Sequence, residues 1–88
     1  MSKDEPPQTL QVKIYSPSKV YYDGKAASLS AKNETGPFDI LPLHHNFITL
    51  LSAGTIVVGT SGSAEQRFDI TNGLLHVKDN VATIFIDV

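Results

Sequence analysis

The stretch TLQVKIY, residues 9–15, alternates apolar and polar side chains. Leu10, Val12 and Ile14 share one side of the chain, and the polar residues between them share the other. This period of two is typical of a β-strand with one buried face. The Ser-Pro-Ser sequence at residues 16–18 ends the strand, because proline cannot donate a hydrogen bond to a neighbouring strand.

Short apolar segments recur along the rest of the chain and are separated by turn-forming residues. Further strands are expected at residues 20–22, 26–31, 47–51, 55–58, 67–71, 74–77 and 81–88. Turns are expected at Asp23-Gly24, 33–37, 52–54, the glycine-rich tip 59–63, Asn72-Gly73 and Asp79-Asn80. Asn72-Gly73 predicts a hairpin in which both residues have positive φ. No segment of about ten residues or more has a helical stripe. The sequence therefore predicts an all-β, two-sheet sandwich of roughly eight to ten short, mainly antiparallel strands.

Length and composition limit the possible functions. A chain of 88 residues forms one domain, and 41% hydrophobic with 18% charged residues are globular values. No apolar run approaches the roughly 18 residues that cross a bilayer, so we expect no direct membrane insertion. The formal net charge of −2, without a basic stripe, argues against a nucleic-acid partner. Residues 1–8 are expected to be a flexible leader and 9–88 the folded domain, and the polar leader indicates the cytoplasm.

The chain contains no convincing catalytic or metal-binding group. Cysteine is absent, which excludes disulfides and thiolate sites. His44 and His45 are adjacent, and on an extended segment they would face opposite sides and not share a metal. The glycine-rich tip lacks the lysine and the following helix of a phosphate-binding loop. The sequence predicts no catalytic residue, no metal and no cofactor.

Residues 38–46, FDILPLHHN, are the least regular stretch. They are apolar without a sustained period, and Pro42 interrupts them. Exposed apolar loops on a rigid β scaffold usually mark a protein contact. In the alternative interpretation, Phe38, Ile40 and Leu41 fold back into the core. The polar or bulky members Asp39, Leu43, His44 and Asn46 are expected at the surface.

The order of these segments resembles the N-terminal β-sandwich domain of the epsilon subunit of rotary F-type ATP synthases, called delta in mitochondria. The resemblance rests on LQVKIYSP (10–17), VYYDG (20–24), TGPFDILPLH (35–44), ITLL (48–51), SAGTI (52–56) and TNGLLHV (71–77). It spans about residues 10–88 and depends on order and spacing. It implies a non-catalytic central-stalk subunit that couples the gamma shaft to the c-ring, peripherally, at the cytoplasmic face of the cell membrane.

The resemblance also implies contact residues. In the family, an acid after the loop glycine faces the c-ring and a histidine contacts the gamma shaft. By position, His44 takes the shaft-facing role, and Pro37 stands where the family has the acid. Asp39 and Leu43 replace family glycines, so the local shape is expected to differ. The predicted partner-binding residues are Pro37, Asp39, Leu43, His44 and Asn46.

The family usually continues into two antiparallel helices that can inhibit rotation or bind ATP. We expect this chain to lack them, so neither property is assigned to its residues. An alternative function is that of a free-standing sandwich that binds a peptide or carbohydrate through Tyr15, Tyr21 and Tyr22. A small barrel that binds single-stranded nucleic acid is disfavoured by the absence of clustered Lys and Arg.

Overall fold

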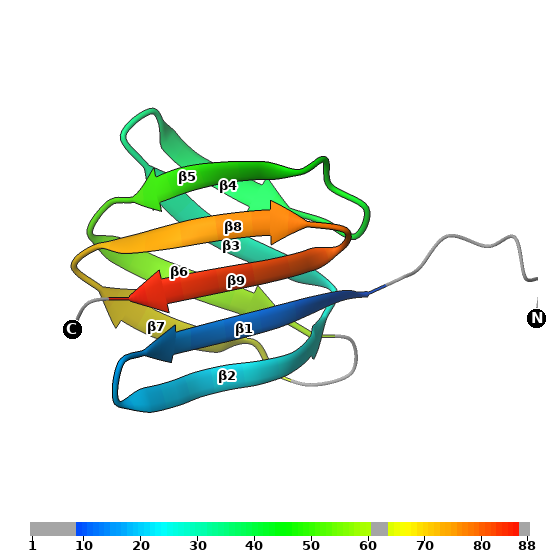
Figure 1. Ribbon diagram of the computed structural model, residues 1–88, viewed down its shortest axis with the longest axis horizontal. Helices are drawn as coiled ribbons and strands as arrows, with labels where there is room; N and C mark the ends of the chain where they lie inside the picture. The colour runs from blue at the N-terminus through cyan, green and yellow to red at the C-terminus, as the bar shows by residue number, and fades with distance from the viewer. Residues whose placement is uncertain (1–8, 61–63, 87–88) are drawn as a thin grey trace, which may run out of the picture.

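The computed structural model describes residues 9–60 and 64–86, which form nine strands in two layers (Figure 1). The five-stranded sheet has the order β2-β1-β9-β8-β5, with β1 Leu10–Ser16, β2 Lys19–Ala26, β5 Phe47–Leu51, β8 Gly73–Lys78 and β9 Val81–Ile86. The four-stranded sheet has the order β4-β3-β6-β7, with β3 Ser28–Asn33, β4 Gly36–Ile40, β6 Gly54–Gly59 and β7 Gln66–Ile70. Within these ranges no helix occurs, and the predicted all-β sandwich is confirmed. The predicted leader 1–8, the turn tip 61–63 and the strand end 87–88 lie outside the described residues.

Neighbouring strands in both sheets are antiparallel, with one exception among the described pairs. β1 and β9 run parallel, in a register that extends from Gln11 opposite Val81 to Tyr15 opposite Phe85. A parallel pair requires a long connection, because the chain must return to the end at which it began. Here the connection is the whole of the chain between β1 and β9, so the pair joins segments that are far apart in sequence.

The core consists of the inward side chains of both sheets. Ile14 of β1, Ile84 of β9 and Leu75 of β8 occupy one inward row across three paired strands, and each has no exposed surface. Their burial stabilises the fold by about 1.5–3 kcal/mol per large side chain. The largest fully buried side chains are Leu10, Val12, Ile14, Leu29, Ile40, Ile56, Val58, Leu75, Val77 and Ile84.

The predicted turn at Asp23-Gly24 is wrong, because β2 continues through it to Ala26. Asp23 pairs with Lys13 and Gly24 pairs with Val12 of β1. The turn preference of the two residues is therefore overridden by a continuous partner strand.

The predicted hairpin at Asn72-Gly73 is also wrong. β7 and β8 belong to different sheets, so the chain crosses between the layers at this point. The two consecutive positive φ angles occur instead at Asp79 (51°) and Asn80 (66°), which form the turn between β8 and β9. That turn has the mirror-image conformation that matches the twist of the adjoining strands.

The interpretation of residues 38–46 as an irregular stretch is wrong for its first part. Residues 36–40 form β4, and the expected loop 33–37 shortens to the two residues between β3 and β4. Asn33 Oδ1 closes this turn by accepting hydrogen bonds from the backbone N–H (3.0 Å) and hydroxyl (2.6 Å) of Thr35. β4 accommodates Pro37 because it lies at the edge of its sheet. Ile40 is buried and Phe38 half-buried, whereas Leu41 is exposed.

Gly36 and Gly24 form a matched pair for testing backbone strain. Gly36 has φ of +125°, and nothing lies within 4 Å of the position that a methyl group would take, so Gly36→Ala should cost about 1–3 kcal/mol through strain alone. At Gly24 a methyl group would make ordinary contacts with the Tyr22 ring at 3.7–3.8 Å, and Gly24→Ala should be neutral or stabilising by up to about 1 kcal/mol. Urea unfolding of the two variants measures the difference, and equal stabilities would contradict it.

Candidate functional site

The segment between β4 and β5, residues 41–46, crosses from the four-stranded to the five-stranded sheet and is called the rim loop below. In Figure 1 it lies at the right-hand end of the sandwich, near the β8–β9 turn. Leu41 and Leu43 expose 56% of their surface each, and His44 is half-buried. The rim loop therefore presents apolar side chains to solvent, as expected for a protein-contact loop.

Leu43 has a left-handed backbone conformation, with φ of 66°. For a residue other than glycine this conformation costs roughly 1–2 kcal/mol. The resemblance implies a glycine at the position of Leu43, and Leu43 adopts a conformation that glycine reaches without strain. The surrounding structure must hold the loop in this shape.

Two asparagines tie the rim loop to the β8–β9 turn. Asn80 Oδ1 accepts a hydrogen bond from the Leu43 N–H (2.8 Å), and Asn46 Oδ1 accepts one from the Asp79 N–H (3.0 Å). Asn80 Nδ2 also donates to the carbonyl of Thr9, immediately before β1 (2.9 Å). The rim loop, the turn and the start of β1 are thus one hydrogen-bonded unit.

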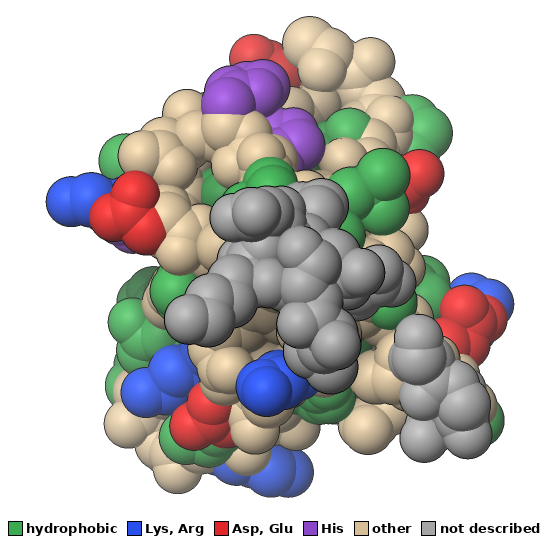
Figure 2. All heavy atoms as spheres, turned by 90° about the vertical axis from the view of Figure 1, so that its right-hand side faces the viewer, with side chains coloured by type: hydrophobic (Ala, Val, Ile, Leu, Met, Phe, Trp, Pro, Cys, Tyr) green, Lys and Arg blue, Asp and Glu red, His purple; other side chains and the backbone are tan. Residues whose placement is uncertain are grey.

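Aromatic and imidazole rings pack beside this unit. The rings of His44 and His45 stack with centroids 4.3 Å apart, and Phe47 lies 5.0 Å from His44 and 5.8 Å from His45. Phe38 meets Phe47 edge to face at 6.1 Å, which connects the cluster to the core. Figure 2 views this end of the molecule and shows histidine side chains gathered at its top, beside apolar ones.

The expectation that His44 and His45 face opposite sides is wrong. It assumed an extended backbone, whereas residues 41–46 form no strand and the two rings stack on each other. His44 Nδ1 lies 2.9 Å from the His45 carbonyl oxygen. Across residues 9–60 and 64–86, no three or more His, Cys, Asp or Glu side chains group as a metal site would require.

The five predicted partner-binding residues fall into two places. Leu43, His44 and Asn46 lie together in the rim loop. Pro37 and Asp39 lie on β4, exposed on the side opposite the buried Ile40. Asp39 accepts a hydrogen bond from the Ser30 hydroxyl (2.7 Å) on the paired strand β3. The two groups therefore belong to different surfaces of the sandwich.

An apolar row on the outer face of the five-stranded sheet was not predicted from the sequence. Cross-strand pairing aligns one residue from each of its strands, in the order Leu50, Leu74, Phe85, Tyr15 and Val20. Leu50 is 73% exposed, and Val20 is 55% exposed at the opposite edge. Exposed apolar side chains that line up in this way usually mark a surface for another protein.

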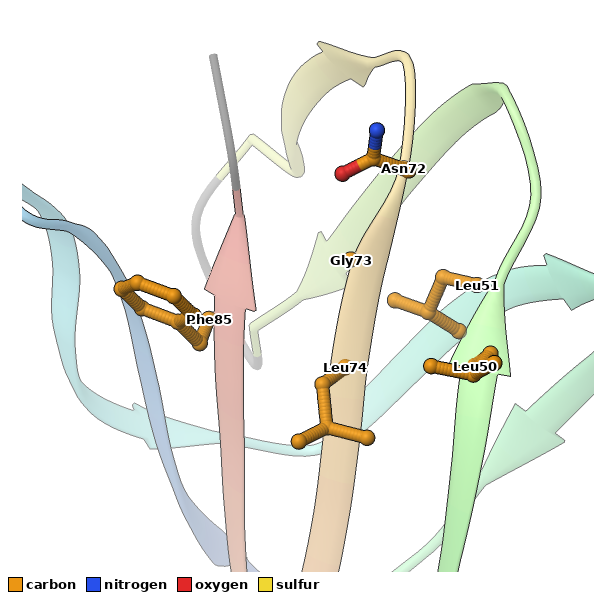
Figure 3. Close-up of a pocket in the computed structure, with 6 residues that line it drawn as sticks. All are labelled: Leu50, Leu51, Asn72, Gly73, Leu74 and Phe85. Atoms are coloured by element: carbon orange, nitrogen blue, oxygen red, sulfur yellow. The ribbon is translucent and has the colours of Figure 1, made fainter.

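Neighbouring apolar residues were the available signal for this row. In Leu50-Leu51 and Leu74-Leu75 the second leucine of each pair is buried, so the first must face outward. A shallow hollow of about 310 Å³ lies at the end of the row, where Gly73 begins β8 (Figure 3). In that view Leu50, Leu74 and Phe85 lie on three neighbouring strands around it.

The tyrosines considered for carbohydrate binding are largely occupied within the fold. Tyr21 and Tyr22 are half-buried against the core. The Tyr22 hydroxyl donates to the Lys25 carbonyl (2.6 Å). Tyr15 packs against Phe85 with ring centroids 5.2 Å apart.

Two packed sheets of mainly antiparallel strands, with no helix among the described residues, place this chain in the class of β-sandwich domains. This chain belongs to the family described as ATP synthase, delta/epsilon chain, β-sandwich domain, whose model matches residues 9–88. The resemblance drawn from the sequence is therefore confirmed.

Curated relatives agree with this membership, and solved structures share the fold. ATP synthase epsilon chains of Xanthomonas euvesicatoria pv. vesicatoria and Psychrobacter arcticus are each 35% identical over 79 residues, which is 90% of this chain but only 56% and 57% of theirs. The chain thus spans little more than half the length of these relatives. A chain in the Euglena gracilis mitochondrial ATP synthase structure has a similar fold (TM-score 0.85, 18% identity, covering 97% of this chain and 54% of that one). Another, in the Tetrahymena thermophila central stalk and c-ring structure, has a TM-score of 0.78 with 19% identity over 96% of this chain and 67% of that one.

Among the residues that the structure describes, no helix has the length and apolar character needed to cross a membrane.

Phe47 should determine the surroundings of both rim histidines. Phe47→Leu removes the ring that packs on them and should shift the ring-proton NMR resonances of His44 and His45, with a loss of stability of about 1 kcal/mol. Phe68→Leu is the matched control, because Phe68 packs against Tyr21 instead (6.5 Å) and should leave those resonances in place. Unmoved histidine resonances in Phe47→Leu would contradict the packing.

Proposed function

We propose that this chain is a non-catalytic rotor subunit of a rotary ATP synthase, which binds the gamma shaft and sits on the c-ring. The observation that carries the proposal is the family match over residues 9–88. The Tetrahymena structure with a similar fold is described as central stalk and c-ring, which agrees with this role. Because the chain spans little more than half of its relatives, the proposal concerns the β-sandwich and not their remaining parts.

The sandwich has the mechanical character that this role requires. A subunit that passes torque between two neighbours must resist bending, and interdigitated side chains between two sheets provide that stiffness. The chain also crosses between the sheets at four points, after β2, β4, β5 and β7. Residues 9–88 would act as one body, with residues 1–8 as a leader.

The separation of the predicted contact residues suits a subunit with two partners. Leu43, His44 and Asn46 in the rim loop would face the gamma shaft. Pro37 and Asp39 on the outer side of β4 would face the c-ring. A subunit that touches both partners at once needs two such surfaces. The exposed apolar row on the five-stranded sheet is a further reason to propose that the protein works within an assembly.

Chemistry would belong to the assembled enzyme and not to this chain. In this role the subunit takes part in proton-driven ATP synthesis by transmitting rotation. Its position would be peripheral, at the cytoplasmic face of the cell membrane. The proposal assigns no ATP binding to these residues.

The gamma subunit from the same organism provides the direct test. The 88-residue chain should bind it in surface plasmon resonance, and His44→Ala should weaken binding about five-fold or more because it removes a central ring of the proposed contact. His76→Ala is the matched control, since His76 is an exposed histidine on β8, away from the rim loop, and should leave affinity unchanged.

Two results would contradict this arrangement. Failure of the folded chain to bind gamma would remove the rotor role. Weakening by His76→Ala but not by His44→Ala would move the shaft contact from the rim loop to the outer sheet face.

A further inference from the structure

The side chain of Asn80 does more than the β8–β9 turn requires. Asp79 and Asn80 both have positive φ, a conformation in which glycine and asparagine are the favoured residues. Glycine would therefore satisfy the turn itself. The amide of Asn80 instead reaches two segments that are distant in sequence, the Leu43 N–H at 37 residues and the Thr9 carbonyl at 71 residues.

These two bonds use both ends of the amide. Oδ1 accepts from Leu43, and Nδ2 donates to Thr9. The Asn80 backbone carbonyl also accepts a bond from the Gln11 N–H (3.1 Å), so the residue is attached to β1 by main chain and side chain. The rim loop is thereby anchored to the rigid centre of the five-stranded sheet.

The bond to Leu43 falls at the strained point of the rim loop. Leu43 is the one residue of the loop with positive φ, and its N–H is held by Asn80. His44 follows directly, and its own N–H donates to the Leu41 carbonyl (3.1 Å) within the bend that Leu43 creates. Loss of the Asn80 side chain would therefore alter the position of His44 through the backbone of Leu43.

We propose that Asn80 is a positioning residue that holds Leu43 in its left-handed conformation and so presents His44 to the gamma shaft. This inference rests on the proposed function. A loop that is already ordered loses less conformational freedom on binding, and affinity is correspondingly higher. Asn46 supports the same arrangement from the other side through the Asp79 N–H.

Three variants separate this role from the role of the turn. Asn80→Gly keeps a residue that tolerates positive φ but removes both side-chain bonds. Asn80→Asp keeps the acceptor for the Leu43 N–H and replaces the donor to Thr9 with a charged carboxylate oxygen. Asp79→Gly is the matched control, because it alters the adjacent turn residue and leaves the Asn80 amide and the backbone N–H of residue 79 in place.

Amide hydrogen exchange of Leu43 in the 88-residue chain is the first measurement. Exchange should be about five-fold faster or more in Asn80→Gly, which is the order of effect expected for one lost hydrogen bond. It should stay close to wild type in Asn80→Asp and in Asp79→Gly. Unchanged exchange in Asn80→Gly would overturn the proposal, whether or not the chain binds gamma.

Gamma binding by the same variants is the second measurement. Asn80→Gly should weaken it about five-fold, whereas Asn80→Asp should restore most of the affinity and Asp79→Gly should leave it unchanged. If exchange at Leu43 rises but affinity for gamma does not fall, the positioning role is overturned while the proposed function stands. If the wild-type chain does not bind gamma, the proposed function fails, and the exchange data still report separately on the loop.

Discussion

The parallel pairing of β1 with β9 organises the whole sandwich. It brings together strands that are separated by most of the chain and sets Val12 beside Ala82 and Ile14 beside Ile84. All four side chains are buried, so the centre of the five-stranded sheet is also the centre of the core. A shift of one residue in this register would turn the apolar set toward solvent, and burial therefore specifies the pairing strongly.

The same pairing also positions the groups that hold the rim loop. Because β1 begins where the β8–β9 turn ends, the Thr9 carbonyl lies within reach of the Asn80 amide. The β8–β9 turn forms hydrogen bonds to the Leu43 N–H and to the Asn46 side chain. These bonds hold a strained loop that contains no glycine in its shape. A stiff two-layer body with a hydrogen-bonded loop at one end would suit the proposed role of passing torque between neighbours, since flexible connections would absorb the torque.

Local sequence patterns were enough to predict the fold class and the buried face of the first strand. Alternation is a local property, and it correctly placed Leu10, Val12 and Ile14 on one buried face. In the last strand, the buried Ala82 and Ile84 alternate in the same way with the exposed Val81 and Phe85. The irregular stretch predicted at residues 38–46 contains the rim loop, although its first three residues belong to β4.

Which segments become neighbours depends instead on tertiary contacts. Asp23-Gly24 remains in a strand because β1 provides partners, and Asn72-Gly73 makes no hairpin because its flanking strands lie in different sheets. The tie between Leu43 and Asn80 likewise joins residues with no local signal in common. Strand pairing aligns the apolar row across the five strands. Local preferences amount to about 1 kcal/mol per residue, whereas strand pairing and burial act on many residues together, so the fold decides wherever the two disagree.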